Sequence, residues 1–330
     1  MGFLVSLITG IFPMLLFAWI LYKLDRYEKE PLRLLGGVFA WGGLLAAGGA
    51  FFVNTILGIG LYALTSSEAA ADLTVGSLVA PVVEESLKGF AVLVIFWVFH
   101  NEFDSILDGI IYGGIAALGF AATENAYYIY TYGFLEDGWR GLLQLVFVRV
   151  ILVGWQHPFY TAFIGMGVAV ARLNKSVILK VGAPLLGWGV AVFTHSLHNT
   201  VHALIPDMAG LVIGTLLDWG GWLGLLGVIA WATYQEKVWI KTHLTAEVEA
   251  ETLTQRQYHA ACSPWRQLAA RIQARFDNNY RTTKRFFQVC GELALKKHQF
   301  EKFGEEKGNS EIISELRGEM RELSAKVGDW

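Results

Sequence analysis

Long apolar segments constrain this chain more than any other feature of its sequence. Each is long enough to cross a bilayer as a helix, which takes about 20 residues at about 1.5 Å per residue. The segments are residues 3–22, 34–63, 75–99, 106–131, 141–171, 180–205 and 209–234. The chain is 54% hydrophobic and 17% charged, whereas a soluble domain carries about 25% charged residues. The sequence therefore predicts an all-α, polytopic membrane protein with about seven transmembrane helices.

The composition becomes polar after residue 234, and 16 of the 26 Lys and Arg residues lie beyond that point. Residues 266–276 and 311–326 place apolar side chains at helical spacing beside charged faces. We therefore predict a transmembrane domain over residues 1–234 and a helical C-terminal tail over residues 235–330. Such a tail packs on itself, on the membrane surface or on another copy of the chain.

The distribution of positive charge predicts how the chain is oriented in the membrane. Four Lys and Arg residues lie between residues 23 and 33, and Arg172, Lys175 and Lys180 lie in or beside the fifth loop. The second and sixth loops hold no Lys or Arg. Because cytoplasmic loops carry the excess of Lys and Arg, we predict that the N-terminus is outside and that the tail is cytoplasmic.

The remaining composition excludes several classes of function. A net charge of −3 argues against nucleic acid as a main partner, since nucleic-acid binding usually shows a strong basic patch. The two cysteines, Cys262 and Cys290, both lie in the polar tail. They therefore provide neither a disulfide framework nor a cysteine-based metal motif.

Residues 80–90, APVVEESLKGF, place Glu84, Glu85 and Lys88 inside an apolar segment. An ionisable side chain at the centre of a membrane helix costs roughly 2.5 to 3.5 kcal/mol, so such residues usually have a function. Lys88 shares a helix face with both glutamates. The three residues therefore form either a neutralised structural ion pair or part of a site for acid–base or metal chemistry.

Further ionisable residues occur in the next three apolar segments, so that they concentrate in four successive segments. They are Asp108, Glu124, Arg149, His157, His195, His198 and His202. At about 1.5 Å per residue, Glu84, Glu124 and His195 fall at overlapping depths toward the outer half of the membrane. Taken alone, Glu124 could be an interfacial residue, and each histidine could be an ordinary polar contact. His195 and Asn199 project from one face, which indicates a shared role.

The order and spacing of these residues resemble the PrsW family of intramembrane proteases over residues 75–205. That family is related to the CAAX prenyl proteases and the bacteriocin-processing enzymes, and more distantly to a structural subunit of γ-secretase. CAAX enzymes would show FxxxH where Glu124 stands, which favours PrsW. The matching motifs are EExxK (Glu84, Glu85, Lys88), FxxxEN (Phe120, Glu124, Asn125), a histidine with a hydroxyl one turn later (His157, Thr161) and HxxxN (His195, Asn199).

The resemblance implies peptide hydrolysis within the membrane. The residues expected to act in catalysis are Glu84, Glu85, Lys88, Glu124 and Asn199. In a metal version, His157, His195 and Glu85 hold a zinc ion, and another glutamate takes the proton of a water. In a metal-free version, Glu84 with His157 activates water, and His195 with Asn199 donates to the oxyanion. The convergence of imidazoles and carboxylates favours zinc.

Two other classes of function remain open from the sequence. Buried Glu, His and Lys residues also form the relays of proton-coupled transporters, although the internal repeats that such transporters often show are not evident here. A catalytically silent scaffold that only binds helices is the other alternative. The resemblance implies a membrane-anchored protein as substrate, such as an anti-sigma-factor-like regulator cut near the outer leaflet. It also implies the lipid bilayer of the bacterial cell membrane as the surroundings.

Overall fold

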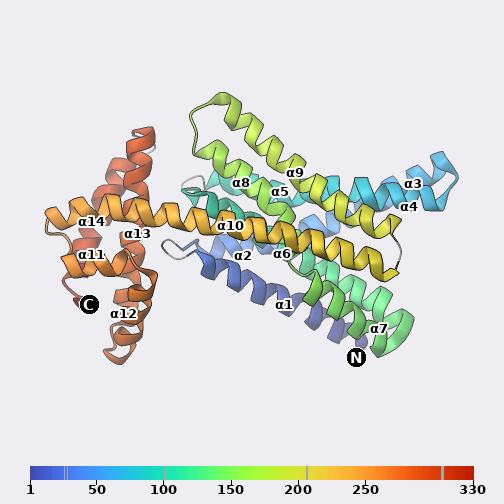
Figure 1. Cartoon of the computed structure of the whole chain (residues 1–330), viewed down its shortest axis with the longest axis horizontal. Coiled ribbons are helices and arrows are strands. Elements are labelled where there is room, and N and C mark those ends of the chain that lie inside the picture. The colour runs from blue at the N-terminus through green and yellow to red at the C-terminus, as the bar shows by residue number, and fades with distance from the viewer. Residues whose placement is uncertain (26, 28, 100–101, 206, 306–307) are drawn as a thin grey trace. The chain divides into compact units, whose positions relative to one another are not determined.

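The computed structural model of the chain is helical throughout, as Figure 1 shows. It describes residues 1–25, 27, 29–99, 102–205, 207–305 and 308–330. None of these residues belongs to a β-strand. The prediction of an all-α protein is confirmed for this part of the chain.

The first helices are α1 (Gly2–Leu24), α2 (Leu32–Ala40), α3 (Ala47–Thr65), α4 (Glu68–Thr74) and α5 (Ala80–Val98). They are followed by α6 (Ile106–Tyr128), α7 (Leu135–Val146), α8 (Gln156–Arg172), α9 (Val177–Leu204) and α10 (Asp207–Glu249). The last are α11 (Gln255–Ala261), α12 (Pro264–Phe276), α13 (Tyr280–Phe303) and α14 (Asn309–Ser324). Wider π-helical turns join several of them, namely η1 (Trp41–Ala46), η2 (Val75–Val79), η4 (Ile129–Phe134) and η5 (Phe147–Leu152).

Five helical stretches of the described chain are long and apolar enough to cross a membrane. They are Gly2–Leu24, Leu32–Thr65, Ile106–Arg172, Val177–Leu204 and Asp207–Glu249. The predicted segments 106–131 and 141–171 both fall inside Ile106–Arg172. None of these five stretches includes the predicted segment 75–99, because Glu84, Glu85 and Lys88 place three charged residues within it. The count of seven transmembrane helices therefore stays a prediction.

The chain divides into two compact units, which we describe separately. The first consists of residues 1–24 and 30–228, and the second of residues 25–29 and 229–330. Helix α10 contributes its first part to the first unit and its last part to the second. The predicted membrane boundary at residue 234 and the cytoplasmic location of the tail remain predictions.

Helix α6 forms the centre of the first unit and packs against α1, α2, η1, α5 and α8. Its small residues permit this close packing, as is common between membrane helices. A Cβ atom added to Gly109 would lie 2.2 Å from the carbonyl oxygen of Gly165 on α8, and one added to Gly165 would lie 1.8 Å from that of Gly109. Larger residues at these two positions would therefore push α6 and α8 apart.

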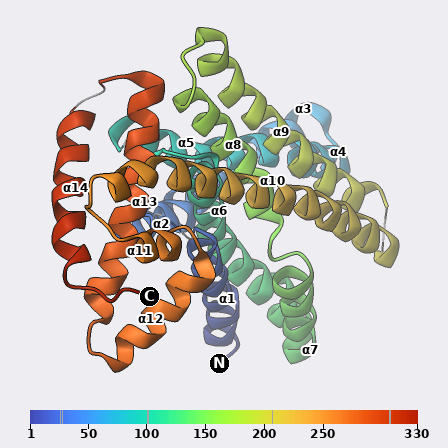
Figure 2. The same ribbon diagram turned by 60° about the vertical axis from the view of Figure 1, so that its left-hand side comes forward.

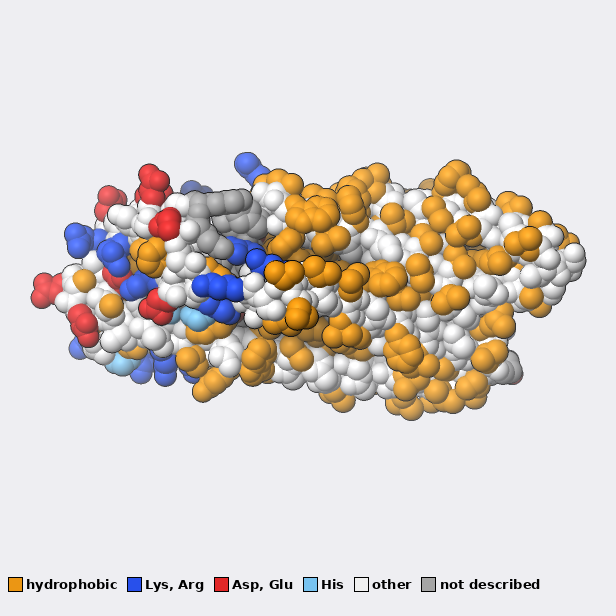
Figure 3. Space-filling view, turned by 90° about the horizontal axis from the view of Figure 1, so that it is seen from above, with side chains coloured by type: hydrophobic (Ala, Val, Ile, Leu, Met, Phe, Trp, Pro, Cys, Tyr) orange, Lys and Arg blue, Asp and Glu red, His pale blue; other side chains and the backbone are white. Residues whose placement is uncertain are grey.

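The outer surface of the first unit is apolar. Figure 3 shows hydrophobic side chains over this unit, whereas charged side chains gather on the second unit. Phe12, Leu44, Leu186 and Leu223 are 69%, 73%, 70% and 71% exposed, respectively. An exposed apolar surface of this extent is costly in water and fits the interior of a lipid bilayer.

The second unit has a hydrophobic core of its own, centred on α13. Phe286, Cys290 and Leu293 of α13 are buried in it, together with Leu244 from the end of α10 and Tyr27 from the loop after α1. Helix α14 lies along α13, as Figure 2 shows. The tail is therefore a folded helical unit, with a core that includes a residue from the N-terminal part of the chain.

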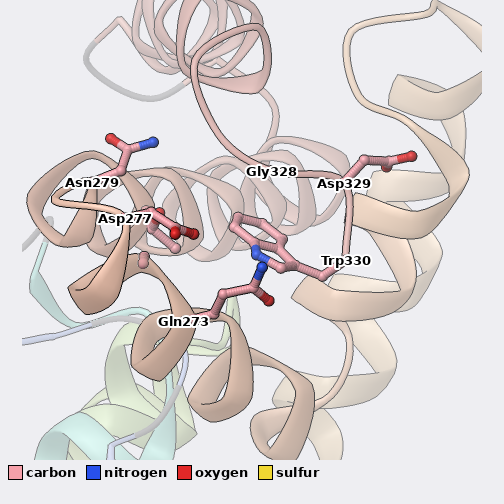
Figure 4. Close-up of a pocket in the computed structure, with 8 residues that line it drawn as sticks. Gln273, Asp277, Asn279, Gly328, Asp329 and Trp330 are labelled. Carbon is pink, nitrogen blue, oxygen red and sulfur yellow. The ribbon is translucent and has the colours of Figure 1, made fainter.

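The C-terminal residues of the chain pack on this unit. Trp330 lies 5.3 Å from Phe287, measured between ring centroids. Together with Gln273, Asp277 and Asn279, it lines a small cavity of about 140 Å³, shown in Figure 4. The C-terminus thus covers one end of α12 and the start of α13.

Both cysteines are expected to be unreactive in the folded protein. Cys262 and Cys290 are 4% and 1% exposed. Burial raises the pKa of Cys262 to about 11, and it also raises the pKa of Cys290. The thiolate is the reactive form, so the raised pKa keeps Cys262 in its unreactive thiol form at neutral pH. A maleimide should label neither residue in the native protein and both after denaturation in SDS. Labelling of native protein at neutral pH would contradict this packing.

Candidate active site

Helix α5 carries three charged residues into the interior of the first unit. Glu84 and Glu85 are 7% and 0% exposed, and Lys88 is 0% exposed. Pro81 stands near the start of α5, which continues from η2 without a break, so its missing N–H leaves a carbonyl oxygen of the preceding turn without its helical donor. Since buried charges require partners, the contacts of these residues show how the site is built.

Lys88 lies at the centre of the site. Its Nζ donates to Glu85 Oε1 at 2.9 Å and to Glu84 Oε2 at 3.3 Å. It also lies 3.2 Å from Nδ1 of His157 and 3.8 Å from the ring centroid of Phe120. These contacts use all three N–H groups of the ammonium and add a cation–π interaction. Lys88 therefore connects both glutamates of α5 to α8 and α6.

Both carboxylate oxygens of Glu85 form hydrogen bonds with neighbouring side chains. Its Oε1 accepts from Lys88 and lies 3.0 Å from Nδ1 of His195. Its Oε2 accepts a hydrogen bond of 2.7 Å from Oγ1 of Thr161. The resulting Nδ1–H tautomer of His195 leaves Nε2 free to face Glu84, whose Oε2 is 4.0 Å away. Glu85 thus orients His195.

His157 is held in the same way by a second carboxylate. Its Nε2 lies 2.9 Å from Oε2 of Glu124, at the end of α6. Since Nδ1 of His157 faces the Lys88 ammonium, it accepts, and Nε2 carries the proton that is donated to Glu124. Arg149 also donates to Glu124, and its Nε donates to Oδ1 of Asn125 at 3.0 Å. Glu124 is thereby a paired, partly buried carboxylate.

The two imidazoles and one carboxylate form a group that can hold a metal ion. One ligand atom each from Glu84, His157 and His195 lies within 4.8 Å of the others, and all three residues are buried. Two histidines and one glutamate, with a further position left for water, are a known ligand set of catalytic zinc. Each imidazole is also hydrogen-bonded to a carboxylate through its other nitrogen, as is typical of metal-ligating histidines. The residues therefore fit a divalent metal.

Two of the three metal ligands predicted from the sequence belong to the group of possible ligands found in the structure. His157 and His195 belong to both, whereas the carboxylate of the group is Glu84 and the predicted carboxylate was Glu85. Asn199 lies one turn after His195 on α9, where its Nδ2 donates to the carbonyl oxygen of Gly76 at 2.8 Å. This contact joins α9 to η2, and the oxyanion role of Asn199 stays a prediction.

Tyr160 and Asp218, which were not predicted as site residues from the sequence, extend the polar network into α10. The Tyr160 ring stacks on His195 with 4.9 Å between ring centroids. Its hydroxyl donates to Oδ1 of Asp218 at 2.8 Å, and Oδ2 of Asp218 lies 2.7 Å from Nδ1 of His198. Asp218 is a buried ionisable residue inside the apolar segment 209–234, which was a detectable signal. The ionisable residues are therefore not confined to four segments.

Helices suited to a membrane, an apolar exterior and a buried Glu/His/His group define a membrane protein with a candidate metal site in its interior. Residues 30–232 match the family model described as PrsW family intramembrane metalloprotease. The chain belongs to this family of bacterial integral membrane proteins.

Curated relatives agree with this assignment. The chain is similar to Protease PrsW of Geobacillus kaustophilus, with 32% identity over 48% of this chain and 64% of that protein. It is 27% identical to Protease PrsW of Bacillus subtilis over 62% of this chain and 88% of that protein. It is 30% identical to Protease PrsW of Shouchella clausii over 62% of this chain and 90% of that protein. The chain thus spans just under two thirds of the Geobacillus relative. No solved structure was found to match the chain.

Proposed function

We propose that this chain is an intramembrane metalloendopeptidase that hydrolyses peptide bonds of membrane-anchored proteins. The observation that carries the proposal is the buried group of Glu84, His157 and His195, contributed by three different helices. Membership in the PrsW family supports the same reaction. A group assembled from α5, α8 and α9 depends on the fold of the whole first unit.

In this proposal, Glu84 and the two histidines are the metal ligands. His157 offers Nδ1, because its Nε2 is bonded to Glu124. His195 offers Nε2, because its Nδ1 is bonded to Glu85. We assign Glu84 as the carboxylate ligand, since both oxygens of Glu85 already accept hydrogen bonds. A bound zinc ion supplies Lewis acidity and lowers the pKa of a water.

The remaining carboxylates orient the ligands and move the proton. Glu85 holds His195, and its complete burial separates it from an incoming substrate. The side chain of Glu124 is 18% exposed and lies 2.9 Å from His157. Since His157 and Arg149 both hold Oε2 of this carboxylate, we assign Oε1 of Glu124 as the general base. A positioned carboxylate of this kind contributes typically 10²- to 10⁴-fold to the rate.

The position of Lys88 favours a second mechanism for the same reaction. Its ammonium lies 3.3 Å from Glu84 and 3.2 Å from His157, close to two of the three proposed ligands. In a metal-free mechanism, Lys88 supplies the positive charge and Glu84 acts as the base that activates water. Donation by His195 to the oxyanion then requires a protonated imidazole, because its Nδ1–H is directed at Glu85, and Asn199 donates through its second Nδ2 hydrogen. With a metal bound, Lys88 must withdraw from the ligand atoms.

The substrate and the orientation follow from the family and from the charge of the loops. We propose a membrane-anchored regulator, such as an anti-sigma-factor-like protein, as substrate. The excess of Lys and Arg in the odd-numbered loops supports an outside N-terminus and a cytoplasmic tail. The cleavage then takes place toward the outer half of the membrane.

The proposal is tested by measuring bound metal and proteolysis on the same purified, full-length protein. We expect about one zinc per chain by elemental analysis, cleavage of a membrane-tethered reporter in liposomes, and loss of cleavage after chelation. Zinc, but not magnesium, should restore it. Cleavage that is unaffected by complete metal removal would select the metal-free mechanism. Proton flux in the same liposomes without any cleavage would overturn the protease proposal in favour of a transporter.

A further inference from the structure

Helix α12 of the second unit carries an apolar face that points away from the core. Its inner side is formed by Gln267, Ala270 and Ala274, which are buried. The opposite side presents four large apolar residues at spacings of three, four and four residues, which places them on one face. They are Trp265, Leu268, Ile272 and Phe276, exposed by 77%, 49%, 52% and 82%, respectively. We call these four residues the α12 outer face.

Within the described part of residues 250–330, the exposed large hydrophobic residues lie almost entirely on α12. Of the large hydrophobic residues that are exposed in the described part of residues 250–330, Phe300 alone lies outside the α12 outer face, and it is 38% exposed. The core of the second unit contains Phe286, Phe287 and Leu293 of α13 without any residue of this face. The described chain therefore leaves the face uncovered, although the unit has a complete core.

Arginines flank the α12 outer face, and α12 contains no acidic residue. Arg266 and Arg275 are exposed, whereas Arg271 donates to Gln267 and lies over the buried ring of Phe287. On a helical projection, Arg266 lies toward one edge of the apolar face and Arg275 lies at the other. An apolar face bordered by basic residues is the pattern of a helix that lies in the plane of an anionic membrane surface.

We propose that the α12 outer face is a membrane-surface anchor that inserts into an anionic lipid bilayer. Trp265, Leu268, Ile272 and Phe276 enter the boundary between headgroups and acyl chains, and the flanking arginines contact lipid phosphates. Tryptophan favours this interfacial depth. Each basic residue near an anionic surface adds attraction that salt weakens.

Charge complementarity favours lipid over a second copy of the chain as the occupant of this face. Two α12 helices that paired through their outer faces would bring the arginines of both copies together, with no acidic residue on either helix to neutralise them. Like charges that face each other are destabilising. Anionic phosphates supply the opposite charge without this repulsion.

The test places a nitroxide label at Leu268→Cys in the full-length protein, with one copy in each lipid nanodisc. The buried native cysteines provide an unlabelled background. In nanodiscs that contain phosphatidylglycerol, the label should be more accessible to oxygen than to a water-soluble nickel chelate. The preference should diminish in pure phosphatidylcholine, at high salt, and in the Arg266→Gln/Arg275→Gln variant.

A label at Ser314→Cys on α14 is the matched control, since Ser314 is also exposed in the tail. It should stay accessible to the nickel chelate in every lipid, and its spectral line shape should show the restricted motion of a label on a folded helix. Equal nickel accessibility of the Leu268→Cys label in both lipids would overturn the anchor. Shielding of that label from both oxygen and nickel would also overturn it, because it would indicate a protein partner.

Discussion

The Glu84→Gln variant is expected to lose its metal and its proteolytic activity together. Glu84 contributes the only carboxylate of the proposed ligand set, together with His157 and His195. Loss of a residue that merely orients a ligand already costs 10- to 100-fold in metal affinity or activity. Loss of the ligand itself should therefore lower zinc affinity and reporter cleavage by more than about 100-fold. Competition with a zinc-sensing dye and cleavage in liposomes measure the two effects.

Two further variants distinguish the role of a metal ligand from the role of the general base. Glu124→Gln at saturating zinc should retain most of the bound metal but lose about 10²- to 10⁴-fold in cleavage rate. Glu68→Gln replaces an exposed carboxylate on α4 and should change neither quantity. Full metal binding by Glu84→Gln would contradict the ligand assignment. Full cleavage by Glu84→Gln would contradict both mechanisms, since each depends on this residue.

The Lys88→Met variant is expected to be the most destabilised of the site variants. Methionine keeps most of the volume of the lysine but leaves Glu84 and Glu85 without the cation that now lies within 3.3 Å and 2.9 Å of them. Removal of one partner from a buried ion pair typically costs about 3 to 5 kcal/mol. The melting temperature in detergent, followed by circular dichroism in the presence of a chelator, should fall accordingly.

The matched control is Lys180→Met, which replaces an exposed lysine at the start of α9 and should leave the melting temperature unchanged. The double variant Glu85→Gln/Lys88→Met removes both charges of the closer pair and should regain part of the lost stability. Addition of zinc should also stabilise Lys88→Met, because a divalent ion supplies the missing charge. Wild-type stability of Lys88→Met without metal would contradict the central position of Lys88.

The candidate site was largely predictable from the order of residues along the chain. The EExxK and HxxxN motifs indicated that α5 and α9 meet, and His157 and Glu124 added α8 and α6. The structure brings Glu84, Glu85, His157 and His195 together. The sequence did not indicate Tyr160 as a site residue, because a tyrosine in an apolar segment is usually an ordinary core residue. Its stacking on His195 appears only when α8 and α9 are packed together.

The sequence motifs do not indicate how α5 is rotated about its axis, and this rotation decides which glutamate lies in the possible metal group. Glu84 and Glu85 are adjacent, so their side chains point about 100° apart around α5. Which of them joins the two histidines in the possible metal group follows from how α5 is rotated against α8 and α9. Contacts such as Gly89 of α5 with Ile164 of α8 set that rotation, since a Cβ at Gly89 would lie 3.0 Å from Ile164. These contacts join residues that are far apart in sequence.

The sequence by itself determined that the chain is helical, that it belongs in a membrane and that carboxylates and imidazoles share an apolar interior. These properties follow from local composition and spacing, because hydropathy and helical periodicity act over about 20 residues. Only the tertiary structure decided that Glu84 shares the metal group, that Lys88 lies among its ligands and that α12 keeps an apolar face outside the core. Each depends on which faces of separate helices pack together, and that is a property of the folded chain.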